Sequence, residues 1–150
     1  MSYDDLLKGR YSEFNRAYFV TTVLREREKR YFSDFDCARC VVEEMRILHH
    51  ENMVSSFAWV VMPDHVHWLF KLGERSNLSS VIKQFKARSA HKVNRYLQRQ
   101  GGLWQKAFYD HALRQEEDLR DIARYIVANP LRAGLVENIG DYPLWDAIWL

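Results

Sequence analysis

Two apolar runs separated by a two-residue turn constrain the fold of this chain more than any other feature. Residues 55–62 and 65–72 are rich in β-branched and aromatic side chains, and only Pro63 and Asp64 lie between them. Such runs favour strands, and Pro-Asp is typical of a tight turn. Because parallel strands need a crossover of about a dozen residues, strands joined this closely pair antiparallel. We therefore expect an antiparallel hairpin within a sheet.

Five further segments complete the expected order of elements. Composition and apolar spacing predict strands over 17–24 and 103–113, and helices over 34–50, 78–99 and 116–129. The order is β-α-β-β-α-β-α, and its first six elements match the ferredoxin-like split βαβ arrangement. We expect an α+β fold, an antiparallel sheet with two helices on one face and an additional C-terminal helix near the open face. No repeat or linker interrupts residues 1–150, so we expect a single domain.

Capping residues indicate where the helices begin and end, because they satisfy backbone groups that have no partner within the helix. Ser33 can cap the first helix, and Gly101 with Gly102 can end the second. The third helix is expected to stop at Asn129, since Pro130 follows it.

The charge of the chain is concentrated in its middle. The formal net charge is +2, yet residues 71–106 carry nine basic side chains and one acidic side chain, Glu74. Such asymmetry indicates an anionic partner, with nucleic acid as the foremost candidate. A solvated helix face explains it equally well, so charge alone leaves both interpretations open.

Neither a membrane span nor a secretion signal is expected. The longest strictly apolar run, Phe57–Met62, has six residues, against about 20 in a transmembrane helix. Asp4 and Asp5 make the first residues acidic, where a signal peptide is basic and then apolar. Cys37 and Cys40 cannot build a disulfide framework, and they form at most half of a zinc site. We expect a cytoplasmic protein with no membrane partner.

Two histidines occupy alternate positions of the expected third strand. Side chains alternate across a strand, so His65 and His67 share one face while Val66, Trp68 and Phe70 share the other. The apolar set should pack on the helices, which leaves the histidines on the open face with Cα atoms roughly 6–7 Å apart. Two imidazoles at this spacing can bind one metal ion. A lone His-x-His is also common at ordinary half-buried positions, so the pair alone decides nothing.

Tyr125 and Asn129 are spaced i, i+4 on the expected last helix, so they lie on the same face. Each has an ordinary interpretation, because a tyrosine beside an apolar stripe packs there and an Asn before Pro ends a helix. Together with two histidines they suggest chemistry. A phenol has a pKa of about 10 and becomes a useful nucleophile when its target is polarised. A metal ion held by two imidazoles and an amide oxygen can polarise a phosphodiester in this way.

Four blocks of sequence give the chain a specific resemblance. They are Val61–Leu69 (VMPDHVHWL), Leu78–Lys86 (LSSVIKQFK), Leu103–His111 (LWQKAFYDH) and Tyr125–Val136 (YIVANPLRAGLV). With these blocks in this order, the chain resembles the REP-associated tyrosine transposases, which lie within the HUH group of single-strand transposases. The resemblance runs over most of the chain, from about Arg10 to about Val136.

The resemblance implies an activity and a site. His65, His67 and Asn129 would bind a divalent metal. Tyr125 would cleave single-stranded DNA, become joined to the 5′-phosphate and release a 3′-hydroxyl. Insertion-sequence relatives carry Gln where this chain has Asn129, and a donor set without thiolates suits Mg²⁺ or Mn²⁺. The family's DNA is a short palindromic hairpin with an adjacent guide sequence, on which the protein would act as a monomer or homodimer.

A row of cations is the expected contact to the DNA backbone. The row consists of Arg88, Lys92, Arg95 and Arg99, which recur at i, i+4, i+7 and i+11 along one flank of the second expected helix. Such a row can hold phosphates without reading the base sequence.

Several alternatives stay open. Tyr109 is a rival nucleophile, although no amide follows it one helical turn on. Trp104, Phe108 and Tyr109 can stack on bases or pack in a core. The chain can also be a non-catalytic nucleic-acid-binding module, an initiator of replication or conjugation, or a hydrolase that activates water on its metal. Detection of a covalent protein–DNA species separates these functions.

Overall fold

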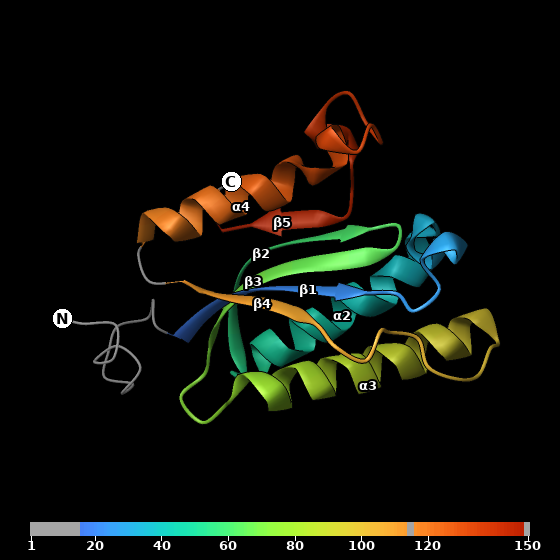
Figure 1. Ribbon diagram of the computed structural model, residues 1–150, viewed down its shortest axis with the longest axis horizontal. Coiled ribbons are helices and arrows are strands. Elements are labelled where there is room, and N and C mark those ends of the chain that lie inside the picture. The colour runs from blue at the N-terminus through green and yellow to red at the C-terminus, as the bar shows by residue number, and fades with distance from the viewer. Residues whose placement is uncertain (1–15, 114–115, 149–150) are drawn as a thin grey trace.

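The described strands of the protein form one antiparallel sheet. The computed structural model describes residues 16–113 and 116–148, and Figure 1 shows how they are layered. Within these residues the sheet has five strands in the order β4-β1-β3-β2-β5. The strands are β1 (Ala17–Val23), β2 (Val54–Met62), β3 (His65–Leu72), β4 (Tyr109–Leu113) and β5 (Trp145–Ala147). The helices are α2 (Phe35–His50), α3 (Leu78–Leu97) and α4 (Glu116–Arg132), with short 3₁₀ helices η3 (Arg27–Lys29), η4 (Tyr31–Ser33) and η5 (Ile139–Asp141).

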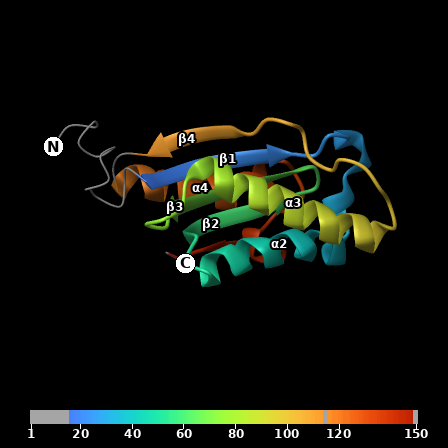
Figure 2. The same ribbon diagram turned by 90° about the horizontal axis from the view of Figure 1, so that it is seen from below.

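The α+β fold expected from the sequence is confirmed. The first four strands have the spatial order β4-β1-β3-β2, which is that of a ferredoxin-like split βαβ sheet. The hairpin of β2 and β3 closes at the pair Met62 and His65, so the Pro63-Asp64 turn lies where it was predicted. Helices α2 and α3 lie side by side on one face of the sheet (Figure 2).

One face of the sheet forms an aromatic core with α2 and α3. Trp68 and Phe70 of β3 are fully buried in it. The Trp68 ring lies 5.4 Å from that of Phe85 in α3, and the Phe85 ring lies 5.7 Å from that of Trp104. Because aromatic side chains each bury about 150–250 Å², this cluster contributes much of the hydrophobic stabilisation. The predicted alternation along β3 is thereby confirmed.

The opposite face of the sheet is partly covered by α4. Leu119, Ala123 and Ile126 of α4 pack in one buried cluster with Ala58 of β2 and Leu69 of β3. From the sequence we expected this face to be open, with the last helix only near it. The face carries apolar as well as polar residues. Helix α4 covers it because the apolar stripe of the helix packs on these apolar residues and shields them from water.

The predicted end of α4 at Asn129 is wrong, because the helix continues to Arg132 with Pro130 inside it. A proline removes one intrahelical hydrogen bond, but the last turn still closes through bonds from Ala133 N to Asn129 O and from Leu135 N to Pro130 O, both 2.9 Å. Gly134, at φ 74°, then terminates the helix in the left-handed conformation that glycine adopts without strain.

Three other boundaries differ from expectation, and one strand was not expected. Asp34 rather than Ser33 caps α2, accepting hydrogen bonds from two backbone N–H groups. Helix α3 ends before the glycine pair, at Leu97, with Gln98 in the left-handed conformation. Strand β4 is shorter than predicted, and Trp104 forms only an isolated bridge to Leu24. β5 was not predicted, because three residues are too few for a periodic signal.

Among residues 16–113 and 116–148, no helix combines the length and the apolar character that crossing a bilayer requires.

Candidate active site

The two histidines of β3 lie together on the face that α4 partly covers. Their ring centroids are 4.7 Å apart. In the sheet, His67 stands opposite Thr21 of β1 and Val60 of β2, and it is 8% exposed. His65, at the start of the strand, is half-buried. The two imidazoles therefore lie next to each other on one face of the sheet, as the alternation of side chains along the strand predicts.

Each imidazole has one nitrogen held by a neighbouring side chain. His65 Nδ1 lies 2.7 Å from Asp64 Oδ1, and His67 Nδ1 lies 2.8 Å from Thr21 Oγ1. Asp64 is itself held by Arg27, whose Nε donates to Oδ2 at 2.8 Å. Such outer partners orient a ring and leave its Nε2 as the ligand atom, as in metal sites generally. Sequence reasoning missed all three partners.

The protonation state of His67 at the site is the one that metal binding requires. Burial, the neighbouring His65 and the Arg132 guanidinium together lower the pKa of His67 to about 3. Burial raises the pKa of Asp64, but hydrogen bonds from His65 and Arg27 outweigh it, so this pKa lies below its ordinary value. His67 is therefore neutral near pH 7, which is the form that binds a metal, and Asp64 is ionised.

Tyr125 reaches this site from α4. It is 45% exposed, and its ring centroid lies 6.0 Å from those of His67 and Phe19. The Arg132 guanidinium lies 4.0 Å above the Tyr125 ring, and its Nη2 donates to the Tyr125 carbonyl at 2.8 Å. Arg132 was missed, although its i+7 spacing from Tyr125 places both on one helix face.

Asn129 follows one turn after Tyr125, as the spacing predicts. Its Nδ2 donates to the Tyr125 carbonyl at 3.5 Å, so the bond uses the amide nitrogen and leaves the Oδ1 oxygen for other contacts. No group of three or more His, Cys, Asp or Glu suited to a metal occurs in the part of the chain that the structure describes. The Asn129 amide oxygen is the candidate third ligand beside His65 and His67, and two imidazoles with one amide fit a site that keeps positions open for substrate.

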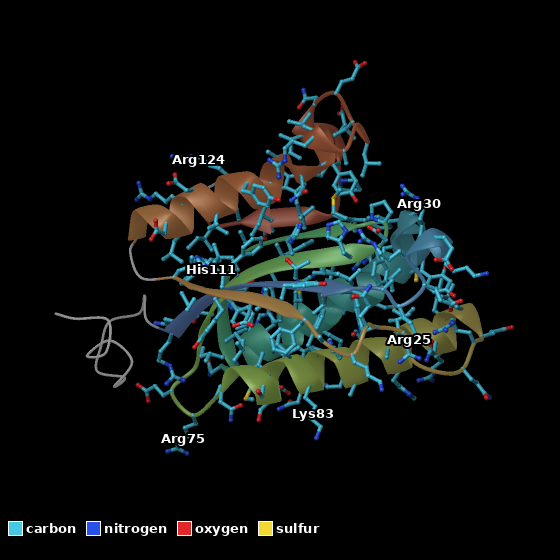
Figure 3. All side chains as sticks on the ribbon, in the orientation of Figure 1. Arg25, Arg30, Arg75, Lys83, His111 and Arg124 are labelled. Atoms are coloured by element: carbon cyan, nitrogen blue, oxygen red, sulfur yellow. The ribbon has the colours of Figure 1, made fainter. Side chains whose placement is uncertain are left out.

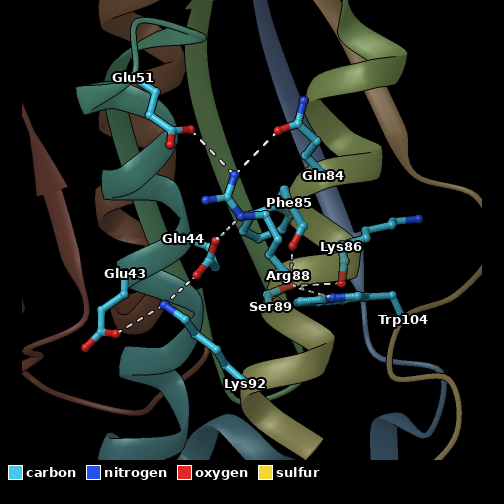
Figure 4. A network of polar contacts seen from close by, with 10 residues as sticks. All are labelled: Glu43, Glu44, Glu51, Gln84, Phe85, Lys86, Arg88, Ser89, Lys92 and Trp104. Carbon is cyan, nitrogen blue, oxygen red and sulfur yellow. Dashed lines mark hydrogen bonds and ion pairs between the residues drawn. The ribbon is translucent and has the colours of Figure 1, made fainter.

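The predicted cation row is divided by the tertiary structure. Arg88 and Lys92 face α2, where Lys92 Nζ lies 2.5 Å from Oε2 of the buried Glu44 and Arg88 Nε lies 3.1 Å from its Oε1 (Figure 4). The latter contact has ion-pair distance without hydrogen-bond geometry. Glu51 and Glu43 lie near the same two cations, at 3.5 Å each.

The other two members of the row are separated from this pair. Arg99 lies beyond the end of α3, against expectation, with its Nη2 3.4 Å from Glu26 and its guanidinium 5.3 Å from the Tyr31 ring centroid. Arg95 is exposed. The structure thus does not align the four as one free row, and their role in DNA binding stays a prediction.

The rival candidates occupy different environments. Tyr109 is 65% exposed on β4 and stands opposite Thr21, so it shares the histidine face across one intervening strand. Trp104 is buried, with its Nε1 donating to Ser89 Oγ at 3.0 Å. Burial raises the pKa of the Cys37 thiol to about 12, which disfavours thiolate ligation.

Comparison with known proteins adds four similarities. Residues 12–129 match the family described as "Transposase IS200 like". A Haemophilus influenzae protein described as "Putative REP-associated tyrosine transposase" is 30% identical over 140 residues, covering 84% of this chain and 76% of that protein. The REP-associated tyrosine transposase of Escherichia coli K12 is 28% identical over 140 residues, covering 88% and 80%. A solved REP-associated tyrosine transposase bound to a REP hairpin has a TM-score of 0.75 and 26% identity, covering 91% of this chain and 79% of that one.

Proposed function

The chain belongs to the IS200-like transposase family, and from that premise we propose that it cuts and rejoins single-stranded DNA through Tyr125 in a metal-dependent reaction. One observation carries the proposal. The Tyr125 ring, on α4, lies 6.0 Å from the ring of His67, on β3. The two elements meet only in the folded chain, and they bring a nucleophile to a pair of metal-ligand side chains.

His65, His67 and the Asn129 amide oxygen would hold Mg²⁺ or Mn²⁺. Bound there, the cation supplies Lewis acidity and orientation to the scissile phosphate. Asp64 and Thr21 hold the imidazoles through Nδ1, which would leave Nε2 of each ring to bind the cation.

Tyr125 supplies the attacking oxygen. As the bond from Oη to phosphorus forms, the bond from phosphorus to O3′ breaks, which leaves a 5′-phosphotyrosine and a 3′-hydroxyl. Water takes up the phenolic proton and supplies that of the 3′-hydroxyl. The Arg132 guanidinium beside the ring is a donor for non-bridging phosphate oxygens. Attack by a 3′-hydroxyl on the phosphotyrosine reverses the step without an external energy source, since the number of phosphodiester bonds is conserved.

A palindromic DNA hairpin is the proposed substrate. Support comes from the solved relative bound to a REP hairpin, to which this chain is similar over 91% of its length. The non-catalytic binding module is the second candidate, and the exposure of Tyr125 beside the neutral imidazole of His67 favours the catalytic function over it.

The test is denaturing electrophoresis of labelled single-stranded hairpin DNA incubated with Mn²⁺ and protein. Wild type should give a slowly migrating adduct, and Tyr125→Phe should give none. Tyr96→Phe is the matched control, because Tyr96 is 44% exposed on α3 and its hydroxyl bonds Asp34 away from the site. Tyr109→Phe should still form the adduct. Cleavage without any adduct would favour a hydrolase, and binding without cleavage would favour the non-catalytic module.

A further inference from the structure

A second set of cations lies along the flank of helix α3 opposite Arg88 and Lys92. This flank faces residues 103–108, and the two border an open cleft of about 440 Å³. Arg25, Lys83 and Lys106 line it and are exposed. Among the residues that the structure describes, none of these three side chains has a carboxylate partner. The positive charge that α2 neutralises on one flank thus stays available on the other.

The wall of the cleft is held in place by Lys86. Its ammonium donates to the carbonyls of Gln105, Lys106 and Ala107 at 2.9, 3.2 and 3.0 Å. These bonds use all three N–H groups of the ammonium, so Lys86 positions the wall and has no donor left for a ligand. They also pair three carbonyl oxygens with a positive charge, which offsets the repulsion that these oxygens would exert on an anion.

The position of Arg25 depends on Gly102. A Cβ added at Gly102 would lie 2.4 Å from Arg25 Nη2 and 2.6 Å from Nη1. Only glycine therefore lets the guanidinium lie against the backbone at this point. Figure 3 shows Arg25 and Lys83 on the α3 side of the sheet, with His111 on β4.

An exposed path leads from this cleft to the candidate active site. Phe108, half-buried at the cleft, directly precedes Tyr109, the first residue of the edge strand β4. Tyr109 stands opposite Thr21, whose hydroxyl bonds His67. Since neighbouring strands are about 4.8 Å apart, Tyr109 lies about two such spacings from His67. Phe108 and Tyr109 are thus aromatic surfaces on the two sides of the sheet edge, and bases can stack on such surfaces.

We propose that this cleft binds the single-stranded DNA adjoining the hairpin, with Arg25, Lys83 and Lys106 on its phosphates, and directs it around β4 to Tyr125. The proposal rests on the proposed function, because it takes single-stranded DNA as the substrate. Three cations that have no carboxylate partner among the described residues suit a phosphate backbone, and the aromatic rings beside them suit unpaired bases rather than a closed duplex.

The test is fluorescence anisotropy with full-length protein in EDTA, so that binding is measured without cleavage. The probes are a blunt DNA hairpin and the same hairpin with a single-stranded extension. Arg25→Ala/Lys83→Ala/Lys106→Ala is compared with Lys29→Ala/Arg39→Ala/Arg75→Ala, which removes the same charge from exposed positions elsewhere. The cleft variant should lose about tenfold or more affinity for the extended hairpin, and its slope of log K against log salt should fall by about 2, since each phosphate contact to a single strand contributes about 0.7.

Gly102→Ala gives an independent check, because it displaces Arg25 while retaining every charge. It should weaken binding of the extended hairpin and leave binding of the blunt hairpin unchanged. Equal losses in the two triple variants, or equal losses for the two probes, would overturn the cleft as the binding site. If wild type forms the Tyr125 adduct while the cleft variant binds normally, only the cleft proposal fails. If wild type binds neither DNA, the proposed function itself fails.

Discussion

The two faces of the sheet bury neighbouring side chains of the same strand, β3, with different consequences. Trp68 of β3 lies in a continuous aromatic core beneath α2 and α3, whereas its neighbour His67 lies on the other face beside Thr21 and Tyr125. Both side chains are largely buried. Burial of Trp68 stabilises the fold, while burial of His67 lowers its pKa and keeps it in the neutral form that the proposed metal ligation requires. The proposed active site thus lies on the face whose buried apolar cluster is the smaller of the two.

Buried polar groups show the same contrast. Glu44, between α2 and α3, is surrounded by Arg88 and Lys92, so its charge is compensated within the fold (Figure 4). His67 has one side-chain partner, through one ring nitrogen, and no carboxylate contact of its own among the described residues. A buried charge that has compensating partners contributes to the structure. An imidazole with only one ring nitrogen bonded can still bind a metal ion through the other.

The largest expected effect is loss of cleavage in His65→Ala and His67→Ala. Each variant removes one imidazole from the proposed metal site, so cleavage of hairpin DNA in Mn²⁺ should fall to background. The fold should persist, because neither side chain belongs to the aromatic core. Circular dichroism with an electrophoretic cleavage assay checks both parts. Wild-type activity in either variant would remove the metal assignment.

Trp68→Ala should show the opposite behaviour. Removal of a fully buried tryptophan should lower the free energy of unfolding by about 3–5 kcal/mol, because it leaves a cavity. The comparison with His67→Ala, one residue away, is made by urea denaturation. An equal loss of stability in the two variants would mean that the two faces do not differ as argued.

Replacing Arg88 and Lys92 by methionine tests the cation row. The double variant leaves Glu44 buried without compensation, so it should lose about 3 kcal/mol of stability or more. Adding Glu44→Leu should restore stability, since a well-packed apolar cluster often replaces a buried ion pair without loss. We expect the stable triple variant to keep the wild-type salt dependence of DNA binding. A reduced slope would show that Arg88 and Lys92 contact phosphates.

The last expected effect is a graded loss of stability in acid, which develops only as the pH falls below about 6.5. The pKa of His67 is about 3 in the folded chain and 6.5 ordinarily, so the unfolded chain takes up this proton first as the pH falls. Its contribution to the free energy of unfolding is full above about pH 6.5 and declines as the pH falls toward 3. Urea titrations in EDTA compare wild type with His67→Gln. Equal pH dependence in both proteins would contradict the assigned burial of His67.

The sequence by itself determined the local geometry of the site. Alternation in a strand has a period of two and in a helix about 3.6 residues, so it put His65 with His67, and Tyr125 with Asn129, before any contact between the elements was known. The hairpin followed equally from two residues, Pro63 and Asp64. These features depend on neighbours in the chain, and the structure agrees with each of them.

Only the tertiary structure decided which charges are free and what completes the site. Arg88 and Lys92 belonged to the predicted DNA-binding row and Lys83 did not, yet α2 places Glu44, 44 and 48 residues away in the chain, against the first two and not the third. Thr21 meets His67 because β1 pairs with β3, and Arg132 reaches the Tyr125 ring because α4 continues through Pro130. The energy of an ion pair or a hydrogen bond depends on distance and burial in space, and neither is encoded in the period of a single helix or strand.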